Sequence, residues 1–152
     1  RQTIRQETPK EDGHIRSQKI LLTWLIDREE LFDQVSRYVT PEDFTVELYR
    51  KVAELLYEQH AKGELNPAQI MNYFTEEEEH RAVAALFNTR IKKLTTAGEQ
   101  EKAIKETILR VKEYSIETAT RNLDPTDIQG LQRLMNAKKA VQDLHKLHIS
   151  IN

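Results

Sequence analysis

Hydrophobic residues recur every three or four positions along most of this chain. The segment 46–62 shows the repeat, with Leu48, Val52 and Leu56 spaced as on one face of an amphipathic helix. No segment alternates between apolar and polar residues over a useful length, as a half-buried strand would. The pattern predicts an all-α protein with about five to seven helices.

The first part of the chain predicts a compact bundle. Residues 1–13 lack periodicity and contain Pro9 and Gly13, so we expect a linker or a disordered lead-in there. Helical periodicity then begins, and we expect a multi-helix bundle subdomain over residues 14–98. Within it, Asn66 stands before a proline, which is the pattern of a capping residue followed by the first turn of a helix.

The end of the chain, residues 99–152, predicts a second subdomain. A long connecting helix is expected over about 99–121, and the segment Asn122-Leu123-Asp124-Pro125-Thr126 ends it. A last amphipathic helix begins near Thr126. So short a connection makes two helices pack as an antiparallel hairpin. Such a hairpin can either lie along the bundle or project from it.

Composition narrows the chemistry. The chain has no cysteine, which removes disulfides, thiolate zinc sites and cysteine nucleophiles. No apolar run approaches the roughly 18 to 20 residues that span a membrane, so we expect a cytoplasmic protein with no membrane contact. Because the first residue is Arg, we also expect a fragment of a longer protein.

Charge is distributed unevenly. Residues 119–152 hold 5 basic and 3 acidic side chains, whereas residues 1–118 hold 18 basic and 22 acidic ones. The net charge of the whole chain is -2, which predicts no strong attraction to nucleic acid along its length. The difference in sign suggests that the tail has a different role from the body.

Candidate catalytic and metal-binding residues are few. The sequence has no glycine-rich phosphate loop, no Gly-x-Ser-x-Gly and no His-Glu-x-x-His. The acidic run Glu76–Glu79 is better explained as the first turn of a helix. His145 and His148 share a helix face, but ordinary surface histidines explain them more simply. We therefore expect this fragment to be no enzyme and to hold no metal or cofactor.

Aromatic and basic residues raise one alternative function. Trp24 and the five tyrosines could stack on bases, although their places at or beside helix stripes favour core packing. The pairs Lys92-Lys93 and Lys138-Lys139 could contact phosphates. A helical module that binds single-stranded nucleic acid is therefore the first alternative.

The elements follow a recognisable order: an apolar first helix, a second helix, an acidic residue before a phenylalanine, and an aromatic residue before an arginine. They are Ile20–Ile26, Leu31–Val39, Asp43-Phe44 and Tyr49-Arg50. This order resembles the C-terminal helicase-binding domain of bacterial DnaG-type primases, over about residues 15–150. The N-terminal domain of the replicative helicase shares these features and is the second alternative, but a hairpin after the body favours the primase.

The resemblance implies a non-catalytic domain of the primosome, the assembly that primes DNA replication. It would dock the primase onto the N-terminal domain of the hexameric replicative helicase at the replication fork, and so couple primer synthesis to unwinding. The parent protein would be a transferase, a DNA-directed RNA polymerase. The fragment would be a monomer in isolation, with weak or no direct binding to nucleic acid.

The resemblance also implies a contact surface, on the exposed side of the last helix. Carried onto this chain, the candidate residues are Leu131, Leu134, Met135, Lys138, Lys139, Val141, Gln142, Leu144, His145 and Leu147. The direction in which these side chains point stays open, because residues of this helix can instead pack against the preceding helix near Ile108 and Val111. The residues for which this inward packing is the alternative are Ile128, Leu131, Met135 and Val141.

Overall fold

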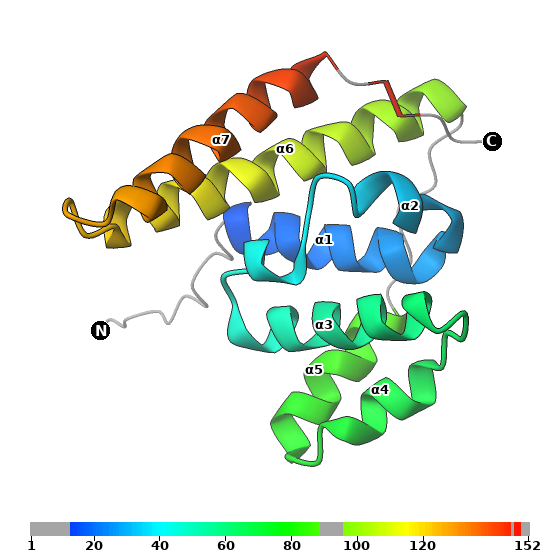
Figure 1. Ribbon diagram of the computed structural model, residues 1–152. Coiled ribbons are helices and arrows are strands. Elements are labelled where there is room, and N and C mark those ends of the chain that lie inside the picture. Colours follow the sequence, from blue (N-terminus) through cyan, green and yellow to red (C-terminus); the bar gives the residue numbers. More distant parts are fainter. Residues whose placement is uncertain (1–12, 89–95, 147, 150–152) are drawn as a thin grey trace, which may run out of the picture.

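The computed structural model describes residues 13–88, 96–146 and 148–149, and all regular structure in these residues is helical (Figure 1). This confirms the predicted all-α class. The helices are α1 (Gly13–Asp27), α2 (Phe32–Val35), α3 (Glu47–Ala61), α4 (Pro67–Tyr73), α5 (Glu77–Asn88), α6 (Ala97–Asn122) and α7 (Ile128–His145). Two 3₁₀ turns, η1 (Glu29–Leu31) and η2 (Pro41–Asp43), flank α2.

Helix α1 lies at the centre of the bundle. It is contacted by α6 along one side and by α3 and α5 on others, as Figure 1 shows. Leu21, Leu22 and Leu25 are consequently 0% exposed. Gln18 is buried too, and its amide oxygen accepts the backbone N–H of Thr45 at 3.0 Å. This bond satisfies a polar group inside the core and fixes the chain that enters α3.

The link from α3 to α4 is built by side-chain amides. The Asn66 side chain accepts the N–H of Gln69 at 3.1 Å, which confirms Asn66 as a helix cap. The backbone N–H of Asn66 in turn donates to Oε1 of Gln59 at 2.8 Å. Gly63 adopts a φ of 78°, a left-handed conformation that favours glycine after a helix end. Together these contacts fix the turn that leads from α3 into α4.

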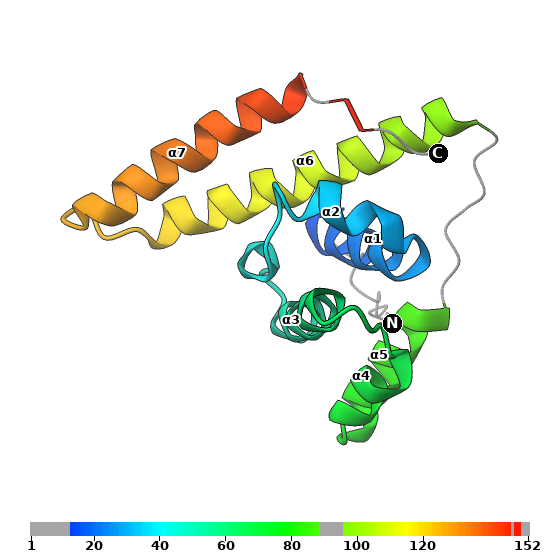
Figure 2. The ribbon, with the colours of Figure 1, turned by 45° about the vertical axis from the view of Figure 1, so that its right-hand side comes forward.

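Helices α6 and α7 form the antiparallel hairpin that the short turn predicts. Figures 1 and 2 show α6 lying between α1 and α7, with the turn between α6 and α7 extending beyond the bundle. Ile104, Ile108 and Val111 of α6 belong to the bundle core. The residues of α6 after Val111 are half-buried or exposed. The hairpin thus lies on the bundle with one half and projects from it with the other.

The C-terminal end of α7 returns to the bundle. Leu144 is 0% exposed and Ile149 is 3% exposed, and both belong to the core. The ammonium of Lys105 donates to the carbonyl oxygen of His145 at 2.7 Å, which holds the end of α7 against α6. We call residues 141–146 and 148–149 the anchored end of the hairpin, and residues 116–137 the projecting end.

The predicted limits of the subdomains have different outcomes. The lead-in falls outside the described residues except for Gly13, which is the first residue of α1. The division after residue 98 stays a prediction. The first half of α6 shares its core with the bundle, because Ile104 and Ile108 pack in the same cluster as the residues of α1.

Candidate functional site

The last helix presents two different faces. Its inner face packs on α6 and carries Leu134, Val141 and Leu144, which are 7%, 9% and 0% exposed. Burial of such side chains removes apolar surface from water and stabilises the hairpin. These three residues therefore hold α7 in place.

The outer face of α7 carries exposed apolar residues. Ile128, Leu131 and Met135 are 78%, 45% and 57% exposed. A spacing of three and then four residues places them along one side of the helix. In the described part of the chain, Ile20 and Tyr73 are the other exposed large hydrophobics. We call Ile128, Leu131 and Met135 the outer strip.

Basic and polar side chains continue the outer strip toward the C-terminus. Lys138, Lys139 and Gln142 are exposed on α7, and so is His145 in its last turn. The outer face thus changes from apolar at the projecting end to basic near the anchored end. Such a surface complements a partner with an apolar groove and acidic residues at one end.

The start of α7 is fixed by its capping residue. The carboxylate of Asp127 accepts the N–H of Gly130 at 2.8 Å. A Cβ on Gly130 would overlap this carboxylate and would lie 2.9 Å from Cδ1 of Leu123. The turn therefore packs closely against α7 at Gly130, and the outer strip begins at a well-defined place.

A second aspartate orders the turn itself. The Asp124 carboxylate accepts the backbone N–H of Thr126 at 2.9 Å and its hydroxyl at 2.8 Å. These hydrogen bonds to the ionised form, the backbone one first, hold the pKa of Asp124 below its usual range. The turn is thus built by local side-chain to backbone bonds, as is common for aspartate.

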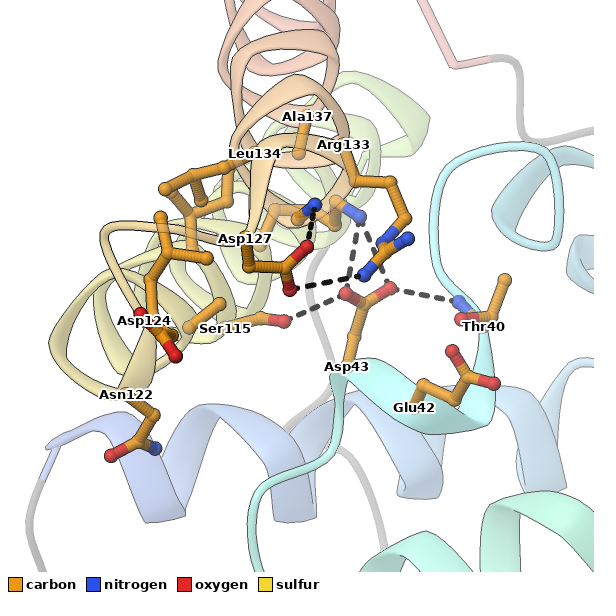
Figure 3. A pocket seen from close by; sticks show the side chains of 15 residues that line it. Thr40, Glu42, Asp43, Ser115, Asn122, Asp124, Asp127, Arg133, Leu134 and Ala137 are labelled. Atoms are coloured by element: carbon orange, nitrogen blue, oxygen red, sulfur yellow. Dashed lines mark hydrogen bonds and ion pairs between the residues drawn. The ribbon is translucent and has the colours of Figure 1, made fainter.

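A cavity of about 480 Å³ lies beneath the projecting end, between η2, α6 and α7 (Figure 3). Leu123, Leu134 and Ala137 form part of its apolar wall. At its rim the guanidinium of Arg133 lies 4.0 Å from the Asp127 carboxylate. The cavity separates the projecting part of α7 from the η2 turn.

One wall of this cavity holds a buried ion pair, which Figure 3 shows. Both oxygens of Asp43 lie 3.1 Å from Nζ of Lys112, and the Ser115 hydroxyl donates to the same carboxylate at 2.8 Å. The backbone N–H of Thr40 also donates to it at 2.9 Å. The Asp43 and Lys112 side chains are 11% and 13% exposed. We call Asp43, Lys112, Ser115 and Thr40 the Asp43 cluster.

The chemistry of the cavity is that of a structural contact. The Asp43 carboxylate accepts from three different residues, so its oxygens are occupied by the protein itself. Within the residues that the structure describes, no group of three or more His, Asp or Glu side chains is placed to hold a metal. His148 lies beyond the end of α7, and its Nε2 is 3.8 Å from the Glu101 carboxylate.

The ten predicted contact residues separate into three groups. The structure exposes most of them, buries three on the inner face, and does not describe Leu147. The exposed group is Leu131, Met135, Lys138, Lys139, Gln142 and His145, and the buried group is Leu134, Val141 and Leu144.

The alternative that this stripe packs inward is correct for Val141 and wrong for Leu131 and Met135, which are exposed. It is also wrong for Ile128, which is the most exposed of the large hydrophobics yet is absent from the predicted contact set. Its spacing to Leu131 and Met135 was the signal that could have found it.

The described residues of the nucleic-acid alternative lie in different environments. Trp24 is 3% exposed, and burial raises the pKa of Tyr57, whose hydroxyl donates to the carbonyl oxygen of Val39 at 2.7 Å. Lys92 and Lys93 lie outside the described residues. Lys138 and Lys139 are exposed, but on the outer face of α7. Trp24 and Tyr57 therefore pack within the protein, as the sequence favours, whereas Lys138 and Lys139 are on the surface.

Comparisons with known proteins complete the description. No family model, curated protein or solved structure matches the chain. Among the described residues, no helix combines the length and the apolar character needed to cross a membrane. The function of the chain must therefore be argued from its own surfaces.

Proposed function

We propose that this chain is the helicase-binding domain of a bacterial DNA primase. It docks the primase onto the N-terminal domain of the hexameric replicative helicase in the cytoplasm, and it performs no catalysis itself. The resemblance in the order of elements suggests this role. The observation that carries it is the outer strip, Ile128, Leu131 and Met135, displayed at the projecting end of a hairpin.

The outer strip suits a helix that docks into a groove. Three apolar side chains at this spacing are the anchors by which an amphipathic helix enters an apolar groove. Complete burial of one such side chain contributes about 1.5 to 3 kcal/mol. The exposed Lys138 and Lys139 lie farther along the same helix and favour a partner with acidic groups there.

Docking would act through local concentration. A primase tethered to the helicase ring meets newly exposed single strand at a much higher effective concentration than a free primase does. This requires a contact surface and a scaffold that presents it, and it requires no catalytic group. The hairpin provides both in this chain.

A titration with the cognate replicative helicase tests the proposal. We expect Leu131→Ser with Met135→Ser to weaken binding about ten- to one-hundred-fold, because docking removes the exposed half of each side chain from water and the two together then contribute about 1.5 to 3 kcal/mol. Tyr73→Ser is the matched control, since Tyr73 is 53% exposed but lies on α4. Unchanged affinity of the double variant would contradict docking through the outer strip.

Point variants are a sharper test than removal of the tail. A chain that ends at Asn122 loses the outer strip, but it also loses Leu144 and Ile149 from the core. Its failure to bind would then reflect unfolding as well as docking. If the intact chain instead binds single-stranded DNA, with an affinity that falls steeply as salt rises, the nucleic-acid alternative is correct.

A further inference from the structure

The packing of α6 on α1 leaves the direction of the hairpin weakly specified. Ile104, Ile108 and Val111 contact the bundle through apolar surfaces. Apolar packing favours a set of crossing angles with some scatter, whereas a hydrogen bond constrains direction more narrowly, so polar contacts on the same helix can narrow its rotation and tilt further. Helix α6 has 26 residues and is about 39 Å long. A small change of its tilt on α1 therefore moves its far end much farther than it moves the residues that contact α1.

The Asp43 cluster lies where α6 leaves the bundle. Lys112 and Ser115 follow Val111, the last buried residue of α6. On a neighbouring side of α6, the ring of Tyr114 stacks on His14 at the start of α1, with 4.1 Å between centroids. Beyond this level the projecting end has the cavity of about 480 Å³ between α7 and η2. The polar and aromatic contacts that α6 makes with the bundle after Val111 therefore lie close together along the helix, at residues 112–115.

The geometry of the Asp43 cluster is directional. One carboxylate accepts two donors from α6, Lys112 at 3.1 Å and Ser115 at 2.8 Å, while Thr40 holds it from the other side at 2.9 Å. Lys112 and Ser115 are three residues apart, so both donors lie on one side of the helix. A rotation of α6 would break at least one of these bonds and leave a nearly buried charge without its partner, which is strongly unfavourable.

We propose that the Asp43 cluster fixes the tilt and rotation of α6 on the bundle, and thereby the direction in which the outer strip points. The cluster adds little apolar burial, and its role is to select one arrangement among several that the apolar contact permits. Buried ionic groups can set register in this way between helices.

The consequence for binding rests on the proposed function. A hairpin held in one direction presents the outer strip in the orientation that the partner needs, so less conformational freedom is lost on docking. Without the cluster, only a fraction of the molecules would hold the hairpin in the orientation that the partner binds. The apparent affinity would then equal the intrinsic affinity multiplied by that fraction. The orientation itself is a property of the free chain and is measured without any partner.

Distance measurement between spin labels tests the proposal directly. The chain has no cysteine, so Gln132→Cys on α7 and Glu58→Cys on α3 give one labelled pair at exposed positions. We expect a single narrow distance distribution for the otherwise unchanged chain. Adding Lys112→Met and Ser115→Ala should shift and broaden it, because both donors from α6 are removed while Thr40 still holds Asp43.

Arg110→Met is the matched control. Arg110 is an exposed cation on α6, two residues before Lys112, and its loss should leave the distribution unchanged. If the variant with both substitutions loses helicity, Ser115→Ala alone keeps the ion pair and should show the same change at smaller amplitude. The same narrow distribution in folded variants would overturn the proposal, whatever the result of the helicase titration.

Discussion

The two ends of α7 belong to one helix but lie in opposite environments. At the anchored end, Leu144 is 0% exposed, and Ile149 beyond the helix is 3% exposed. At the projecting end, Ile128 and Met135 are 78% and 57% exposed. The same kind of residue therefore lies in the core at one end and on the surface at the other. Hydrophobicity alone therefore does not tell which residues of α7 belong to the core.

The largest effect should separate these two ends directly. We expect Leu144→Ala to lower the free energy of unfolding by about 2 to 5 kcal/mol, because it removes a fully buried side chain and leaves a cavity. Met135→Ala should change it by about 0.5 kcal/mol or less, since an exposed side chain loses few contacts. Urea denaturation measures both values. Equal effects would mean that the projecting end is as much a part of the core as the anchored end.

The second effect concerns the turn that connects α6 to α7. Alanine normally stabilises a helix relative to glycine by about 1 kcal/mol. At Gly130 we expect the reverse, a loss of about 1 to 2 kcal/mol, because a Cβ there would displace the capping Asp127 and press on Leu123.

Gly98→Ala is the matched control for this substitution. Gly98 also lies in a helix, but the nearest atom to its Cβ would be the Thr96 hydroxyl at 3.9 Å, which is ordinary contact. We expect this variant to be neutral or more stable in the same urea titration. If Gly130→Ala were more stable than the unchanged chain, the turn would have room for a Cβ at this position. The close packing of the turn against α7 would then be contradicted.

The helical elements could be predicted because most of them bury one stripe. The main departure is the predicted helix Leu31–Val39, which is the turn η1 followed by the short α2, Phe32–Val35. Here Leu31, Phe32, Val35 and Val39 are all 0% exposed. Their spacing imitates a helix, but they fold around the end of α1 as a compact turn.

The site could be predicted only in part, because α7 carries two apolar stripes. Leu134 and Val141 follow a buried stripe, and Leu131 and Met135 follow a neighbouring stripe that stays exposed. Periodicity reveals both stripes, but which of them meets α6 depends on how the turn positions the helix. The Asp43 cluster could not be predicted for another reason, because Lys112 and Ser115 lie 69 and 72 positions from Asp43 in the sequence.

The smallest effect tests whether the projecting end has a stability of its own. The pKa of Asp124 is lowered in the folded chain by its bonds to Thr126, so the ionised carboxylate is favoured by folding. The stabilisation from this group is therefore present above the usual pKa of an aspartate, and it is lost as the pH falls through the lowered value. Acid should loosen the turn first, because the Asp124 carboxylate is exposed and its bonds to Thr126 are local to the turn.

Hydrogen exchange along α7, at neutral pH and in mild acid, measures this difference. We expect the amides near Gly130 to lose protection in acid while those near Leu144 keep it. Asp124→Asn, which retains an acceptor but does not titrate, should remove the part of this pH dependence that comes from Asp124. Equal loss of protection at both ends would show instead that the hairpin opens as one cooperative unit with the core. The anchored and projecting ends would then differ in exposure but not in local stability.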